Sequence, residues 1–133
     1  MKAVFADTSY YVAFVNPCDE RHAAALMVSR ELRRPIVLTD YVLAELGSRL
    51  SERAQRRLFL ELVATLRAAP FTTIVPASRA LFDRGLALFR RRLDKDWSLI
   101  DCISFEVMLS HRIKEALTTD HHFEQAGFTA LLR

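Results

Sequence analysis

The sequence predicts an α/β sandwich with a mostly parallel sheet. Short apolar runs alternate with longer amphipathic runs along the whole chain, which is the pattern of strands joined by crossover helices. Only three Gly and four Pro occur among the 133 residues, so loops must be short and helix should dominate. The chain contains no internal repeat, low-complexity segment or linker, and its length fits one domain. We therefore expect a single domain over residues 1–133.

The first elements are bounded by prolines. Residues 4–6 form a short apolar run that ends at an acid, which indicates a buried strand. Residues 9–15 are expected to form a short helix that ends before Pro17. Residues 20–33 carry apolar side chains at helical spacing and are followed by Pro35, so they should form an amphipathic helix.

The middle of the chain continues this alternation. Residues 36–38 indicate a second strand. Thr39 or Asp40 can cap the helix that we expect at residues 41–50. The long amphipathic run over residues 51–69 predicts another helix, which the next proline ends.

The second half is expected to add two long helices to the fold. One lies at residues 78–92, and its inward side should hold Leu81, Leu88 and Phe89. The other lies at residues 99–112, which are apolar on almost every side, so this helix should be central and buried. The remaining elements are strands at 72–75, 116–119 and 128–131, and a short helix that carries Phe123 and Ala126 and ends at Gly127.

The composition indicates a folded protein of the cytoplasm. Hydrophobic residues make up 51% of the chain and charged residues 26%, which is enough to bury a core and excludes disorder. No apolar stretch approaches the ~20 residues that span a membrane, and the first residues lack the apolar region of a signal peptide. We interpret Cys18 and Cys102, which form no CxxC motif, as reduced thiols.

The basic residues permit a nucleic-acid partner. The formal net charge is +3, and only three of the 19 cationic residues are Lys. Arginine binds phosphate in a bidentate manner, although codon bias in a GC-rich genome explains the excess equally well. We interpret the densest patch, Arg90, Arg91 and Arg92, as a candidate RNA contact, with a solvated helix end as the alternative. The same two interpretations apply to Arg49, Arg53, Arg56 and Arg57.

Four acidic residues stand where an ionised side chain is unusual. Asp7 and Asp120 end short apolar runs, at the carboxyl ends of their expected strands. Glu45 interrupts an apolar run, and Asp101 opens a nearly all-apolar stretch. Ionised carboxylates are rarely buried without partners, and parallel sheets bind ligands beyond the carboxyl ends of their strands. We interpret the four acids as one cation site.

If the acids converge, the electrostatics of such a site require either that some acids are protonated or that a cation is bound. Two carboxylates ~4 Å apart repel by about 4 kcal/mol at an effective dielectric constant near 20. Several such pairs would offset much of a domain's stability of roughly 5–15 kcal/mol. An all-oxygen ligand set selects Mg²⁺ or Mn²⁺. Because a carboxylate-held Mg²⁺ can activate water for attack on phosphate, phosphodiester hydrolysis is the natural reaction class.

Each acid also has an ordinary alternative. Asp7 and Asp120 could cap the helices that follow them. Glu45 could pair with Arg49, one turn later, on a surface face. Asp101 lies in a first helical turn, where negative charge suits the helix dipole. The joint pattern carries more weight than any single member.

Four short motifs resemble those of PIN-domain nucleases, and their order and spacing match from end to end of the chain. They are residues 5–9 (FADTS), 43–46 (LAEL), 96–101 (DWSLID) and 117–123 (LTTDHHF), with Gly127 following. The third and fourth motifs are the more specific ones. Single-domain chains of this size most resemble the toxin ribonucleases of VapBC-type toxin–antitoxin pairs.

The resemblance implies a three-layer α/β/α sandwich with a short, mostly parallel central sheet. It implies that Asp7, Asp101 and Asp120 hold one or two Mg²⁺ or Mn²⁺ ions. Glu45 would complete the catalytic quartet, either by ligating through water or by steering the attacking water. The implied reaction is Mg²⁺-dependent endonucleolytic hydrolysis of RNA, which leaves a 5′-phosphate and a 3′-hydroxyl. The implied partner is a cognate antitoxin protein.

Four further polar residues of the motifs are candidates for a supporting role. Ser9, Ser98 and Thr118 could orient the carboxylates through hydroxyl hydrogen bonds, or they could serve as caps and strand-end hydroxyls. Asp96 could be a further acid at the rim, but we favour the alternative of an exposed residue at the helix entry that pairs with Lys95 or with an Arg.

Aromatic and histidine side chains next to the motifs have two interpretations each. Trp97 could stack on a base, or it could pack under a loop, which we favour. His121 and His122 could donate protons near the leaving group, but we expect both to be exposed residues of a first helical turn.

The apolar residues of the helices at 20–33 and 51–69 exceed what one small core needs. A homodimer, which we expect, or an antitoxin helix could cover the excess, and ordinary core packing is the simpler alternative.

Two rival functions also fit part of the pattern. A non-catalytic PIN-like protein that binds RNA or a partner would keep the acids as a vestigial metal site. An aspartyl-phosphate phosphatase needs a second Asp at the position of Ser9. Since none of the four acids is missing, we favour the nuclease.

Overall fold

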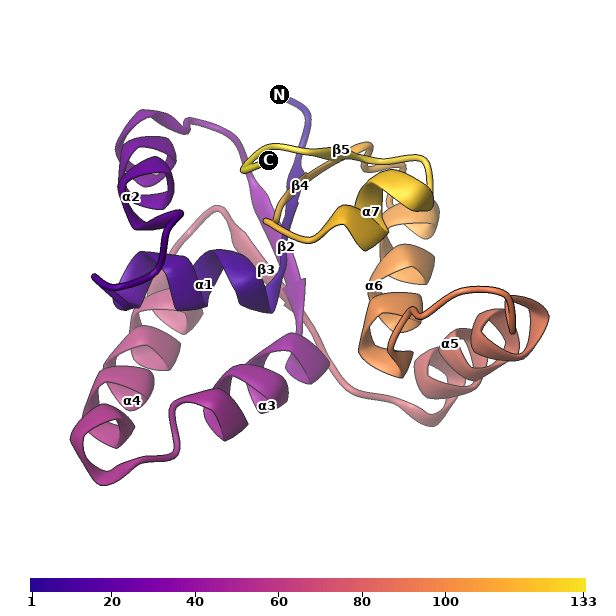
Figure 1. Cartoon of the computed structure of the whole chain (residues 1–133), viewed down its shortest axis with the longest axis horizontal. Coiled ribbons are helices and arrows are strands. Elements are labelled where there is room, and N and C mark those ends of the chain that lie inside the picture. Colours follow the sequence, from indigo (N-terminus) through magenta and orange to yellow (C-terminus); the bar gives the residue numbers. More distant parts are fainter.

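The computed structural model describes residues 1–133 and contains one five-stranded sheet in which every strand pair is parallel (Figure 1). The strand order is β3-β2-β1-β4-β5. The α/β class and the parallel sheet predicted from the sequence are therefore confirmed. The strands are β1 (Val4–Ala6), β2 (Ile36–Thr39), β3 (Thr72–Val75), β4 (Glu115–Leu117) and β5 (Thr129–Ala130).

Helices cover both faces of the sheet. From β1 the chain moves outward to β2 and β3, and it then returns past β1 to β4 and β5. Because crossovers between parallel strands are right-handed, this reversal places α1–α4 on one face and α5–α7 on the other (Figure 1). The expected three-layer sandwich is confirmed. The helices are α1 (Thr8–Val15), α2 (His22–Glu31), α3 (Asp40–Arg49), α4 (Arg53–Ala68), α5 (Arg79–Arg91), α6 (Leu99–Ser110) and α7 (His121–Gln125).

The chain reverses its direction across the sheet next to β1, which pairs with β2 on one side and with β4 on the other. At such a switch point the connections leave neighbouring strands toward opposite faces, and a crevice opens beyond the carboxyl ends of the strands. Asp7 follows β1 directly, and Asp120 lies between β4 and α7. The topology therefore brings these two acids to one crevice.

Helix α6 buries more residues than any other helix, as its apolar sequence predicts. Its Phe105 ring packs edge-on against Phe123 and Trp97, with ring centroids 5.0 and 5.1 Å away. Gly85 of α5 lies so close to α6 that an added Cβ would be 2.3 Å from Cγ1 of Ile103. These contacts fix α6 in the fold, and with it the acid in its first turn.

Two expectations for the second half of the chain were wrong in detail. Helix α6 ends at Ser110 rather than at residue 112, because Arg112 adopts a left-handed backbone conformation with φ 56°. Phe89 was expected to face inward but is 41% exposed. Helix α5 packs chiefly against α6, so it buries only a narrow side that holds Leu81 and Gly85.

Three smaller features complete the fold. Thr39, one of the two expected caps of α3, accepts a hydrogen bond from the Val42 amide at 3.1 Å. Cys18 is exposed and Cys102 is buried, and neither forms a disulfide. None of the helices combines the length and the apolar character that a membrane span requires.

Candidate active site

The four acids that the sequence singles out line one cavity of about 210 Å³. They come from four segments: Asp7 from the end of β1, Glu45 from α3, Asp101 from α6 and Asp120 from the loop after β4. No hydrophobic residue lines this cavity, which sets it apart from an ordinary packing defect. The lining residues are Asp7, Thr8, Ser9, Glu45, Arg49, Asp96, Ser98, Asp101, Asp120 and His122.

Asp7 is held by two hydroxyl groups. Its Oδ2 atom accepts hydrogen bonds from Ser9 Oγ at 2.8 Å and from Thr118 Oγ1 at 2.9 Å. Its side chain does not cap α1. The capping role considered for Asp7 is therefore absent. Burial raises the pKa of the Asp7 carboxyl to about 6; the two hydroxyls oppose this shift, and the charge of Asp101 adds to it. Asp7 is therefore a buried acid that an added cation would stabilise in its ionised form.

The same hydroxyls connect the ends of β1 and β4. Ser9 Oγ and Thr118 Oγ1 lie 3.1 Å apart. The Thr119 amide donates to Ser9 Oγ, and the Asp120 amide donates to Thr118 Oγ1, both at 3.0 Å. This network fixes Asp7 and the loop that carries Asp120 relative to each other.

Asp101 belongs to a capping box at the start of α6. The Ser98 hydroxyl accepts from the Asp101 amide at 2.9 Å, and Asp101 Oδ2 accepts from the Ser98 amide at 3.1 Å. The Ser98 hydroxyl thus acts on the backbone and not on the carboxylate. Burial raises the pKa of Asp101, and the charge of Asp120 adds to the shift. Asp101 therefore stabilises the first turn of α6 and also lines the cavity.

His122 lies between two of the acids. Its Nδ1 atom is 3.2 Å from Asp101 Oδ2 and 3.3 Å from Asp120 Oδ1. The His122 side chain is only 20% exposed, so its prediction as an exposed residue was wrong, whereas His121 is 54% exposed as expected. Asp120 also caps α7, because its Oδ1 accepts from the His122 amide at 2.9 Å. Two adjacent histidines in the sequence gave no sign of which one turns inward.

Glu45 and Arg49 both line the cavity, but they form no salt bridge with each other. The surface pairing considered for Glu45 is therefore absent. Asp96 is exposed at the rim and makes no ion pair with Lys95 or with an arginine. The pairing that the sequence favoured for Asp96 was wrong, because Arg92 reaches Asp94 instead.

The basic patch Arg90–Arg92 does not line the cavity. Arg92 donates two hydrogen bonds to Asp94, at 3.0 and 3.1 Å, and its guanidinium lies 5.0 Å from the centre of the Trp97 ring. Trp97 is buried and donates its Nε1–H to Gln125 at 3.0 Å. Trp97 therefore packs under the loop before α6, as favoured, and is not open for stacking on a base. Arg90 and Arg91 are exposed, and their contact with RNA stays a prediction.

The donor set of the cavity fits a hard divalent cation. Five carboxylates and several hydroxyls supply oxygen, which suits Mg²⁺ or Mn²⁺. No cysteine lines the cavity, so a thiolate zinc site is excluded here. The possible ligand atoms of Asp120, His121 and His122 lie within 4.8 Å of one another, but of the two histidines only His122 lines the cavity.

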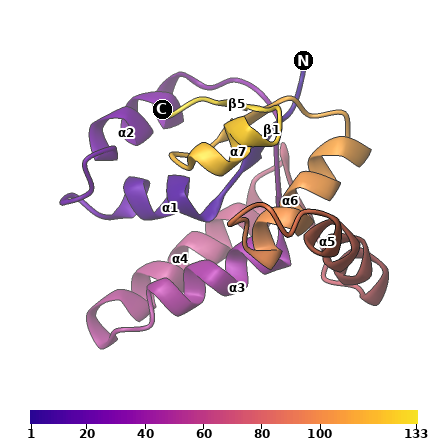
Figure 2. The same ribbon diagram turned by 45° about the vertical axis from the view of Figure 1, so that its right-hand side comes forward.

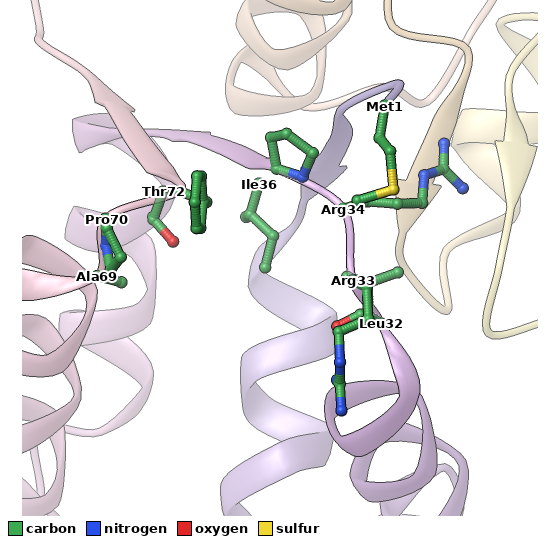
Figure 3. Close-up of a pocket in the computed structure, with 10 residues that line it drawn as sticks. Met1, Leu32, Arg33, Arg34, Ile36, Ala69, Pro70 and Thr72 are labelled. Carbon is green, nitrogen blue, oxygen red and sulfur yellow. The ribbon is translucent and has the colours of Figure 1, made fainter.

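A larger cavity, of about 570 Å³, lies at the opposite edge of the sheet, at the amino ends of β2 and β3 (Figure 3). Its walls are largely apolar, and no acid lines it, so it offers no chemistry comparable to that of the acid cavity. Its lining residues are Met1, Leu32, Arg33, Arg34, Pro35, Ile36, Ala69, Pro70, Phe71 and Thr72.

Comparison with known proteins gives matches over almost the whole chain. The family model described as PIN domain matches residues 4–129. Two proteins named 23S rRNA-specific endonuclease VapC20, from the CDC 1551 / Oshkosh and H37Rv strains of Mycobacterium tuberculosis, are each 29% identical over 126 residues. These matches cover 94% of this chain and 95% of each relative.

Solved structures show the same fold. The crystal structure of Mycobacterium tuberculosis VapC20, described as a sarcin-ricin loop cleaving toxin, matches with a TM-score of 0.86 and 25% identity, over 95% of this chain and 96% of that one. FitAcB from Neisseria gonorrhoeae matches with a TM-score of 0.62 and 17% identity, over 96% of this chain and 94% of that one. The second likeness concerns the fold alone.

Proposed function

The chain belongs to the PIN-domain family, and from this premise we propose that it is a divalent-metal-dependent endoribonuclease that acts as the toxin of a toxin–antitoxin pair. One observation carries the proposal. Four acids from four separate segments line a single cavity without a hydrophobic residue, at the switch point of a parallel sheet. No arginine or lysine forms a salt bridge with any of the four acids. The negative charge of the four carboxylates is therefore available to bind a metal cation.

We propose that Asp7, Asp101 and Asp120 hold the metal ion or ions, and that Glu45 completes the set. A bound Mg²⁺ or Mn²⁺ would neutralise the carboxylates, polarise the phosphate and lower the pKa of water, which makes water a nucleophile at neutral pH. Asp7 is suited to this role because one of its oxygens receives two hydroxyl hydrogen bonds, which leaves the other oxygen free of side-chain partners.

The chain's other residues would keep the acids in position. Ser9 and Thr118 orient the Asp7 carboxylate. Ser98 fixes the first turn of α6 and therefore the backbone of Asp101. His122 contacts both Asp101 and Asp120, and so holds acids from two segments at a set separation. Hydrogen bonds of this kind around metal ligands are worth 10–100-fold in metal affinity or activity, to order of magnitude.

The substrate class is proposed from the relatives. VapC20 is named for cleavage of 23S rRNA, and we propose that this chain likewise cleaves a structured RNA in the cytoplasm, as a single domain over residues 1–133. A cognate antitoxin would control it. The homodimer expected from the sequence stays a prediction, which light scattering of the purified protein would test. Exposed apolar side chains on α2 and α4, among them Met27 and Leu60 at 59% and 66% exposure, offer contact area to either partner.

The decisive experiment is incubation of the purified protein with a mixed RNA pool in Mg²⁺ or Mn²⁺, with and without EDTA. We expect endonucleolytic products with 5′-phosphates in metal and none in EDTA. Asp101→Asn, which keeps the size of the side chain and removes its charge, should abolish cleavage while the circular dichroism spectrum stays unchanged. Cleavage that persists in EDTA, or in Asp101→Asn, contradicts the proposal. Tight RNA binding without any product over hours would instead favour the non-catalytic alternative.

A further inference from the structure

Arg49 is the only arginine or lysine among the ten residues that line the acid cavity. It lies in the last turn of α3, one turn after Glu45. Residues four apart share a face of a helix, so the face of α3 that brings Glu45 to the acids brings a guanidinium to the same place. A cation is thus built into the wall of an acidic cavity.

The Arg49 guanidinium is not used by the acids around it. Five carboxylates line the cavity, and Arg49 forms a salt bridge with none of them. Four arginines elsewhere do pair with an acid, among them Arg34–Glu115 and Arg133–Glu124, both at 2.7 Å. Arg49 is exposed and makes no hydrogen bond within the protein that would occupy its donors.

Resting on the proposed function, we infer that Arg49 binds a phosphate of the RNA substrate next to the bond that is cleaved. RNA brings negative charge to a cavity that is itself acidic, and the Arg49 guanidinium in the cavity wall offsets part of the repulsion between the two. A guanidinium presents a planar fork of donors that matches two phosphate oxygens. An arginine already paired with a carboxylate would first have to break that pair, and Arg49 has none to break.

The cationic surface continues from Arg49 onto the next helix. Helices α3 and α4 form a hairpin (Figure 2), and exposed arginines occupy the first turns of α4. None of them forms a salt bridge, and only Arg56 makes a hydrogen bond, to the Ser51 carbonyl at 3.0 Å. These residues provide contacts for further phosphates beyond the cavity. They are Arg53, Arg56 and Arg57.

The test measures RNA binding separately from cleavage. Asp101→Asn is placed in every variant to block cleavage, and the affinity for a labelled single-stranded RNA is measured by fluorescence anisotropy in Mn²⁺ at several KCl concentrations. Arg49→Ala should weaken binding about tenfold. It should also reduce the slope of log K against log salt by about 0.7, the contribution of one phosphate contact to a single strand. Arg49→Lys keeps the charge without the fork, and should give an intermediate affinity with the original slope.

The matched control is Arg67→Ala, which removes the same charge from another exposed arginine without a salt bridge. Arg67 lies in the last turn of α4, next to the amino end of β3 and away from the cavity. We expect this variant to bind RNA like its parent. Equal affinities and salt slopes for Arg49→Ala and Arg67→Ala would overturn the inference.

A purely structural role for Arg49 gives a different result. If Arg49 served only to neutralise the acids, Arg49→Ala would change Mn²⁺ affinity or the melting temperature and leave RNA binding unchanged, which also overturns the inference. Failure of the proposed function is seen independently, since it appears as absence of cleavage by the unsubstituted protein. The anisotropy result decides the role of Arg49 in either case, and absence of RNA binding by the parent overturns it.

Discussion

Thr118 Oγ1 donates a hydrogen bond to Asp7 Oδ2 at 2.9 Å, which joins residues that are 111 positions apart in the chain. Both lie just beyond the ends of strands that pair directly, β1 and β4. The hydroxyl also accepts from the Asp120 amide. One small side chain therefore serves two of the proposed metal ligands at once, and the acid cavity depends on residues that are not themselves acids.

Thr118→Val keeps the shape of this side chain and removes the hydroxyl. We expect a loss of about 1–3 kcal/mol in unfolding free energy, because Asp7 and the Asp120 amide lose a buried partner. The pKa of Asp7 should rise further, since the Thr118 hydroxyl lowers it, and metal-dependent cleavage at neutral pH should fall. Urea denaturation and initial rates measure both effects. Thr118→Ser retains the hydroxyl and is the control; if it is as impaired as the valine variant, the hydrogen bond is not the cause.

Asp7→Asn should stabilise the metal-free protein at neutral pH. Burial raises the pKa of Asp7 from 3.8 to about 6, so the folded state binds more protons than the unfolded state between these values. Stability from this group is therefore present at low pH and is lost as the pH rises through the window from 3.8 to about 6. At pH 7 the ionised carboxylate costs roughly 2–4 kcal/mol, and asparagine removes part of that cost.

Thermal melts of both proteins in EDTA at pH 4 and pH 7 measure this effect. We expect a higher melting temperature for Asp7→Asn at pH 7 and a small difference at pH 4. Added Mn²⁺ should raise the melting temperature of the unsubstituted protein alone. An Asp7→Asn protein that is less stable at pH 7 without metal would show that the buried charge is compensated by other groups.

His122→Ala should weaken Mn²⁺ binding by about 10–100-fold, because the imidazole that contacts both Asp101 and Asp120 is lost. Isothermal titration calorimetry measures this directly. His121→Ala is the control in the neighbouring position. Its side chain is 54% exposed and 3.6 Å from Asp120, and exposed ion pairs contribute little, so the change should be much smaller. Tighter Mn²⁺ binding by His122→Ala would mean that the imidazole competes with the metal.

Gly85→Ala should destabilise the protein by about 1–3 kcal/mol, because overpacking forces neighbouring side chains or backbone to shift. Its Cβ would lie 2.3 Å from Ile103 Cγ1 and 3.1 Å from the Ile103 Cα atom. Gly47→Ala is the matched control, since it also lies within a helix and its Cβ would meet only the Phe59 ring, at 3.0 Å. Denaturant unfolding compares the two. Equal stabilities of both variants would contradict the close α5–α6 packing.

The sequence predicted the elements well because apolar periodicity is a local property, and most of these elements have one clear apolar side. It also identified the acids, since a charge at the end of an apolar run is visible without any structure. It did not predict the exposure of Phe89, which depends on how narrow a face α5 buries against α6. The periodicity of α5 alone does not contain that information.

The supporting residues of the cavity were harder to predict for the same reason. His121 and His122 are adjacent and identical in type, and only the direction of the short helix α7 decides which one meets Asp101. Arg49 was considered as the partner of Glu45, because spacing along a helix shows proximity. Contacts from distant segments decide whether Glu45 and Arg49 pair with each other or both face the cavity.

The pairing of β1 with β4 has a consequence for how the protein is made. β1 leaves the ribosome first, whereas β4 and the loop with Asp120 are synthesised near the end, after α6 and Asp101. A nascent chain therefore lacks at least one of the four cavity acids until residue 120 of 133 has been added. The complete acid cavity can therefore form only when nearly the whole chain has been synthesised.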